Sequence, residues 1–155
     1  MLRIWRFATL LLGALGLALG AAHVLELAPK MRYDAEMYMA VTSTLYRFFG
    51  SVGAVIQLGA IFMAFVLAFL VRHRPVFRLT LFGTLGLVLS LVLWAVLVAP
   101  VNAEWLEMMK SAPDAAPEAY LRLRPRWEYG HVAAFVAWLI GFGLLLRSVL
   151  TETPE

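Results

Sequence analysis

Residues 48–71, FFGSVGAVIQLGAIFMAFVLAFLV, form a stretch of 24 residues that contains no Asp, Glu, Lys or Arg. A helix needs about 20 mainly apolar residues to cross the roughly 30 Å of hydrocarbon in a bilayer. Three further uncharged stretches of similar length lie at residues 7–25, 79–103 and 129–146. The sequence therefore predicts four transmembrane helices.

The rest of the chain is too short for a separate soluble domain. It has 155 residues, of which 63% are hydrophobic, and its mean hydropathy is +0.82. Because the uncharged stretches occupy more than half of it, we predict a single integral membrane domain over residues 1–155. The predicted fold is all-α: a four-helix transmembrane bundle of up-down-up-down topology, with two longer outer connections. The spans are expected at about residues 5–27, 46–71, 79–102 and 129–148.

The basic residues predict how the bundle is oriented. Arg3 and Arg6 precede the first span, and a short connection without acids carries Arg72, Arg74 and Arg78. Positive residues favour the cytoplasmic side, so we expect a multi-pass protein of the inner cell membrane with both termini in the cytoplasm. The outer side carries seven basic residues and the cytoplasmic side carries six, so the total number of positive charges differs little between the two sides.

The two outer connections, residues 26–47 and 104–128, hold eight of the ten acids. We interpret them as solvated segments of mixed charge, with an irregular stretch around Pro113, Asp114 and Pro117. The N-terminal run also resembles a secretory signal ending at Ala22. It is longer than the apolar core of such a signal, so we interpret it as a span.

Composition excludes several classes of function. The chain has no cysteine, which rules out disulfides and thiolate metal sites. The sequence pI is about 9.6, but no basic stripe with interleaved aromatics suggests nucleic acid. Motifs for nucleotides, phosphates or a hydrolytic triad are missing as well. The expected partners are the lipid bilayer and a lipophilic small molecule, and a homo-oligomer stays open.

Helical periodicity predicts which face of each span points inward. At 100° per residue, Gly13, Gly16, Gly20 and His23 share one face of the first span, and Gly16 and Gly20 have the spacing that lets another helix approach closely. We therefore expect His23 to point into the bundle. Similar small or polar faces occur in the other spans: Tyr46, Gly50, Gly53, Gln57, Ala60 and Ala64; Gly83, Gly86, Ser90 and Trp94; His131, Ala134, Trp138 and Gly141.

The two histidines are the first candidates for chemistry. His23 and His131 are expected at the same outer depth, and ionisable side chains in a membrane usually face the bundle interior. Asn102 lies at that end too, and Gln57 lies roughly 14 Å deeper along its helix. We predict an outward-facing pocket with His23 and His131 as catalytic residues and Glu128 orienting the ring of His131. Its further candidates are Tyr46, Arg47, Gln57, Trp94, Asn102, Trp105, Trp127, Glu128 and Trp138.

A plainer interpretation exists for most of these residues. Histidines near helix ends often bind backbone carbonyls, and Trp105 and Trp127 fit an interfacial aromatic belt. Gln57 and Ser90 are also suited to joining neighbouring helices by hydrogen bonds.

Four short stretches resemble a known family. Residues 99–105, APVNAEW, and 124–131, RPRWEYGH, are similar to the anthrone-oxygenase-like membrane proteins. Residues 23–30, HVLELAPK, and 45–47, LYR, are similar to the bacterial members. Asn102, Trp127 and His131 carry the pattern, whereas the Arg that often follows the last histidine is missing from residues 132–136.

The resemblance implies oxidation of a phenolic polycyclic anthrone to a quinone by O₂, without a cofactor. A histidine titrates near neutral pH and could remove the activated proton, leaving an anion that reduces O₂. Trp94 and Trp138 would supply stacking walls. One alternative is a haem or metal protein ligated by His23 and His131, with Glu26, Glu128 or Asn102 as a third metal ligand. The other is a non-catalytic membrane scaffold or small-molecule binder.

Overall fold

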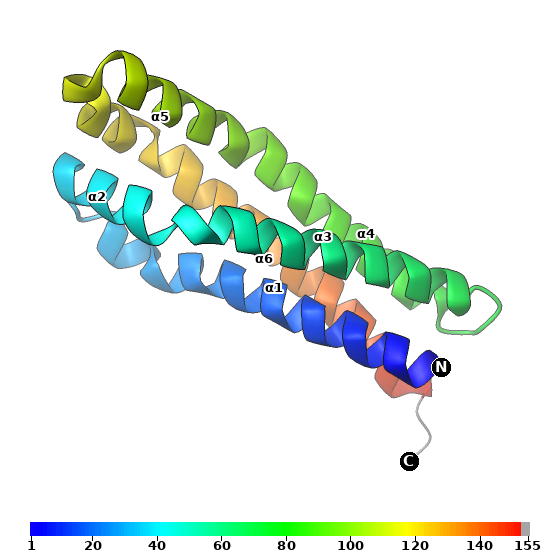
Figure 1. The fold of residues 1–155 in the computed structure, drawn as a ribbon. Helices are drawn as coiled ribbons and strands as arrows, with labels where there is room; N and C mark the ends of the chain where they lie inside the picture. The colour runs from blue at the N-terminus through cyan, green and yellow to red at the C-terminus, as the bar shows by residue number, and fades with distance from the viewer. Residues whose placement is uncertain (153–155) are drawn as a thin grey trace.

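The fold is an all-α bundle built from four long helical rods (Figure 1). The computed structural model describes residues 1–152, except for the side chain of Arg47. The rods are α1 (Leu2–Lys30); α3 (Arg47–Leu70); α4 (Phe77–Leu93), which continues through the π-helix η1 (Trp94–Val98) into α5 (Ala99–Ser111); and α6 (Ala116–Glu152). The short helix α2 (Ala35–Leu45) and the 3₁₀ turn η2 (Pro113–Ala115) complete the connections.

Each rod contains a stretch long and apolar enough to cross a membrane. These stretches are Leu2–Lys30, Phe48–Leu70, Phe77–Ser111 and Pro113–Glu152. The predicted all-α fold is confirmed, and the chain is a multi-pass membrane protein.

The helices extend well beyond the predicted spans. The third rod continues to Ser111 and the fourth begins at Ala116, so most of the outer segment expected to be a solvated connection is helical. The first connection also holds a helix, α2, whose N-terminus is capped by Asp34 accepting a hydrogen bond from the amide of Met37 at 2.8 Å. Charged residues therefore marked the ends of the apolar stretches and not the ends of the helices.

Glycines allow α1 to pack closely on α6. A β-carbon added to Gly13 would lie 2.8 Å from the Phe142 ring, and one added to Gly16 would overlap Trp138. The Trp138 indole also donates a hydrogen bond to the carbonyl of Gly13 at 2.9 Å. The predicted inward face of the first span is thus confirmed, and it continues at Gly20, which faces Phe135.

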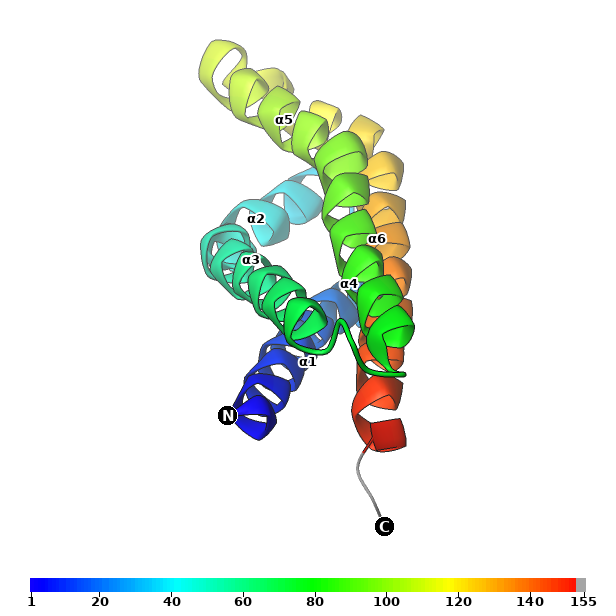
Figure 2. The ribbon, with the colours of Figure 1, turned by 90° about the vertical axis from the view of Figure 1, so that its right-hand side faces the viewer.

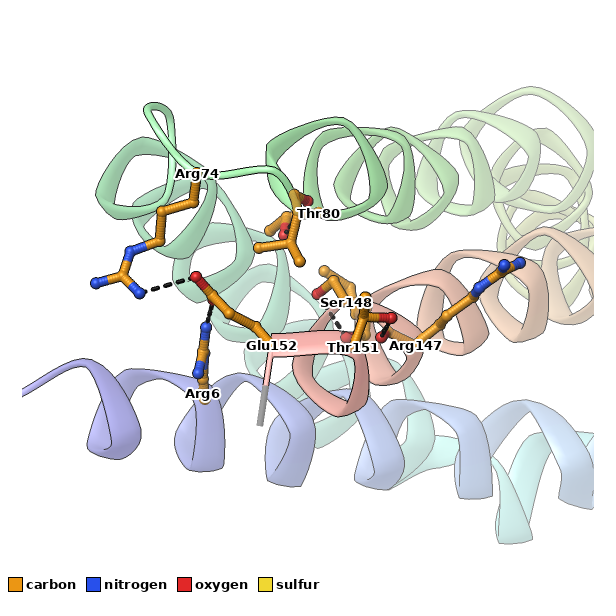
Figure 3. A network of polar contacts seen from close by, with 9 residues as sticks. Arg6, Arg74, Thr80, Arg147, Ser148, Thr151 and Glu152 are labelled. Atoms are coloured by element: carbon orange, nitrogen blue, oxygen red, sulfur yellow. Dashed lines mark hydrogen bonds and ion pairs between the residues drawn. The ribbon is translucent and has the colours of Figure 1, made fainter. Parts of the chain in front are cut away.

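One ion cluster joins three segments at the end of the bundle where the chain begins (Figure 3). Glu152, at the end of α6, accepts a hydrogen bond from Arg74 at 2.8 Å and forms an ion pair with Arg6 of α1. The start of α1, the connection between α3 and α4, and the end of α6 therefore meet. Residues 153–155, which follow Glu152 and were predicted to lie in the cytoplasm, are outside the described residues.

The π-helix accommodates Pro100 in the third rod. Proline has no amide hydrogen to donate to the carbonyl four residues earlier, which here is that of Val96. The guanidinium of Arg126 donates to this carbonyl at 3.1 Å, and the amide of Ala99 bonds five residues back to Trp94. Wide turns of this kind often occur near functional sites.

Candidate functional site

The two candidate histidines meet face to face between α1 and α6. The ring centroids of His23 and His131 are 4.0 Å apart and their planes differ by 21°. Tyr46, at the start of α3, also stacks on His23, with a centroid distance of 4.8 Å. The ring of Trp127 lies across the edges of this stack, and its centroid is 4.2 Å from that of His131 and 5.2 Å from that of His23. Residues from three parts of the chain thus form one aromatic cluster.

A hydrogen bond fixes which nitrogen of His131 is free. Its Nδ1 lies 2.9 Å from the backbone carbonyl of Trp127. A carbonyl oxygen only accepts hydrogen bonds, so Nδ1 carries the hydrogen, and in the neutral ring the lone pair is on Nε2. His131 therefore offers Nε2 as a base or ligand. The side chain of His23 is buried, and its Nδ1 has no hydrogen-bond partner among the described residues.

The aromatic cluster forms part of the wall of a cavity of about 930 Å³. Its lining includes nine of the predicted residues: His23, Tyr46, Gln57, Trp94, Asn102, Trp105, Trp127, His131 and Trp138. Trp127 is held in place by donating its indole hydrogen to Asn102 Oδ1 at 2.8 Å. The side chain of Arg47 lies outside the described part of the chain.

Glu128 does not line the cavity but belongs to a buried ionic group next to it. Its carboxylate lies 2.9 Å from the ammonium of Lys30 and accepts a hydrogen bond from the Tyr38 hydroxyl at 3.1 Å. The Lys30 ammonium lies over two rings of the aromatic cluster, 4.7 Å from the centroid of Tyr46 and 5.0 Å from that of Trp127. Burial, and then the negative charge of Glu128, raise the pKa of Tyr38.

Sequence reasoning missed Lys30 and Tyr38. Lys30 follows His23 by seven residues and shares its helical face, a spacing that could have revealed it. Arg124 holds this end of α1 by donating to the carbonyls of Lys30 and Tyr33, at 3.2 and 2.8 Å. Tyr38 gave no signal, because it lies on a helix whose position depends on contacts with α6.

The geometry of the histidines does not fit the haem alternative. Two axial histidines must lie on opposite faces of a porphyrin, and rings stacked at 4.0 Å leave no space between them for one. Nearly parallel rings also direct their lone pairs side by side and not toward a common ion. The described residues hold no group of three or more His, Cys, Asp or Glu side chains suited to a metal ion.

Comparisons with known proteins add no assignment: no family model, curated protein or solved structure matches the chain.

Proposed function

We propose that this protein is a membrane oxygenase that oxidises a lipophilic aromatic compound of the anthrone type with O₂ and without a cofactor. The observation that supports this most directly is the state of His131 at the wall of an aromatic cavity: its Nδ1 is hydrogen-bonded to the Trp127 carbonyl, and its Nε2 has no hydrogen-bond partner among the described residues. The resemblance of residues 99–105 and 124–131 to the anthrone-oxygenase-like proteins points to the same reaction.

The reaction needs a base and O₂ but no further reactant. Nε2 of His131 takes a proton from the CH₂ carbon of the anthrone, and the resulting anion passes one electron to O₂. The carbon radical and superoxide combine to form a C–O bond, and the imidazolium returns its proton to the peroxide. Loss of the second C–H proton then breaks the O–O bond and releases water. Anthrone and O₂ thus give anthraquinone and water.

The cavity is suited to such a substrate. Trp94, Trp127 and Trp138 provide flat apolar surfaces against which a fused ring system can pack. Asn102 already accepts from Trp127, which leaves its amide hydrogens for a carbonyl or phenol oxygen of the substrate. An apolar cavity also takes up O₂ from the membrane.

The experiment is an anthrone oxidation assay with the detergent-purified protein, following O₂ uptake and the absorbance of anthraquinone. We expect His131→Gln to lower the rate above the protein-free background by about 100-fold or more, as for removal of a general base. The matched control is His73→Gln, because His73 is exposed in the connection at the opposite end of the bundle. Equal rates for wild type, His131→Gln and buffer would contradict the proposal.

Two further measurements on the same sample distinguish the oxygenase from a non-catalytic binder and from a haem protein. Quenching of tryptophan fluorescence by anthrone without O₂ uptake would favour a non-catalytic small-molecule binder. A Soret band in the absorbance spectrum would indicate haem and would require the stacked histidines to separate.

We further propose that the bundle lies in the inner cell membrane with both termini in the cytoplasm. Exposed arginines gather at the end where the chain begins, among them Arg3, Arg72, Arg78 and Arg147. The cavity would then lie in the outer half of the membrane. A C-terminal fusion to green fluorescent protein should fluoresce and one to alkaline phosphatase should be inactive; the reverse pattern would contradict this orientation.

A further inference from the structure

The cavity reaches the surface of the bundle along one side. All of its exposed lining residues belong to two helices: Gly50, Ala54 and Leu58 on α3, and Asn102, Leu106 and Met109 on α5. Figure 2 shows the ribbons of α2 and α3 separated from those of α4 and α5 on this side. The cavity therefore opens between α3 and α5, and we call these six residues the mouth.

The mouth is a slot parallel to the helices. Gly50, Ala54 and Leu58 follow one another at intervals of four residues, so they form a stripe about 12 Å long on α3. The exposed surface next to this stripe is apolar, with Val55 74% and Phe62 62% exposed. Because α3 is one of the helices suited to crossing a membrane, this slot faces hydrocarbon over much of its length.

The two ends of the cavity differ in chemistry. Near α2 and α5 the lining carries two polar groups that remain for a ligand: the amide hydrogens of Asn102, whose oxygen accepts from Trp127, and Nε2 of His131. The first can donate a hydrogen bond and the second can accept one, so this end is suited to binding an oxygenated ring. Toward the middle of α3 the lining is mainly apolar, with Gln57 and Ser90 as exceptions. It includes the rings of Phe135 and Trp138 and the smaller residues Gly53, Ala54, Leu58 and Ala134.

We propose that the mouth is a lateral entrance through which an amphiphile dissolved in the membrane reaches the histidines. Its oxygenated ring lies at His131 and Asn102, and an aliphatic arm lies along Gly53, Ala54 and Leu58, parallel to the lipid chains. The identity of the ring as an anthrone or quinone rests on the proposed function. The volume of about 930 Å³ supports the arm, because it is near the upper limit of the roughly 300–1,000 Å³ typical of ligand cavities and exceeds what a bare tricyclic ring needs.

Matched substitutions test the entrance. Ala54→Phe places a large ring in the mouth, and its control, Ala18→Phe, places the same ring on an exposed position of α1 that does not line the cavity. Gly50→Leu and its control Gly143→Leu form a second pair. A β-carbon added to either glycine meets no atom within 4 Å, but only Gly50 lines the cavity.

The probes are anthraquinone and an anthraquinone with a long alkyl chain, added to the protein in phosphatidylcholine nanodiscs. Stopped-flow quenching of tryptophan fluorescence gives the binding rate, and titration gives Kd corrected for partition into lipid. We expect the alkyl chain to strengthen binding to the wild type at least about tenfold. Each mouth variant should lower the binding rate by a similar factor, and Ala54→Phe should remove the gain from the chain.

Several results would overturn the proposal: mouth variants as fast as their controls, no gain from the alkyl chain, or no quenching by either probe. Failure of the proposed function gives a different pattern, since these measurements need no turnover. A protein that binds both probes through the mouth but consumes no O₂ with anthrone would keep its entrance and lose its assignment as an oxygenase.

Discussion

Lys30 and Glu128 form an ion pair of 2.9 Å in which each residue is only 1% exposed. The pair links the C-terminal end of α1 to α6 next to the stacked histidines. Charges removed from water in this way are tolerated only when each has its partner. Mutations at this pair should therefore show how far the candidate site depends on it.

Removing one partner should cost more than removing both. We expect Lys30→Met to destabilise the protein by about 3 kcal/mol or more, because Glu128 is left buried without its cation. The double variant with Lys30→Met and Glu128→Leu should recover part of this loss. Thermal unfolding in detergent, followed by tryptophan fluorescence, measures both. A double variant less stable than Lys30→Met would contradict this account.

The burial of Tyr38 next to Glu128 leads us to predict a loss of stability at alkaline pH. Its pKa is raised in the folded protein by burial and by Glu128, whereas in the unfolded chain it is about 10. The folded state therefore keeps the phenol proton when the unfolded state loses it, so this contribution is present below pH 10 and declines as the pH rises further. Between pH 9 and 11 the stability difference between wild type and Tyr38→Phe should shrink. A stability difference that stays constant over this range would contradict this account.

The packing of α1 on α6 predicts that a larger side chain destabilises the protein at one glycine and not at another. Gly16→Leu should lower stability by about 1–3 kcal/mol or more, because its side chain would overlap Trp138. A side chain added at Gly143 would enter open space, so Gly143→Leu should change stability by no more than about 0.5 kcal/mol. Thermal unfolding of both variants checks this, and equal melting would mean that Gly16 does not face α6.

Arg126 and Pro100 should be energetically coupled. Arg126→Met removes the donor to the Val96 carbonyl and should cost about 1 kcal/mol. In a Pro100→Ala background the restored amide hydrogen can serve this carbonyl, so the same change should cost less. A double-mutant cycle of thermal stabilities measures the coupling. Additive effects would show that the arginine does not compensate for the proline.

Helical periodicity was enough to predict much of the fold and part of the candidate site. Along an uninterrupted helix, spacing alone places Gly13, Gly16 and Gly20 on one face, and these are the positions that pack on α6. The same reasoning directed His23 and His131 inward, where they stack.

The rest depends on contacts between segments that have no common periodicity. Glu128 was expected at the pocket and at His131, but its nearest partners are Lys30 and Tyr38. Tyr38 lies on α2, and nothing in its neighbourhood in the sequence indicates that this helix packs on α6. The ring of His131 is instead oriented by the backbone of Trp127, and a backbone carbonyl leaves no trace in an amino-acid sequence.

The π-helix at Trp94–Val98 also amounts to one additional residue within the third rod. Such a turn holds one residue more than an α-turn, so the extra residue is taken up locally and the rotation of α5 about its axis is kept. Deleting a single residue there would therefore leave a regular α-turn with Asn102 and Trp105 still at the cavity, whereas inserting one more would turn α5 by about 100° and move them away. Members of any lineage that retains this cavity should therefore tolerate the loss of one residue between Trp94 and Val98 better than the gain of one.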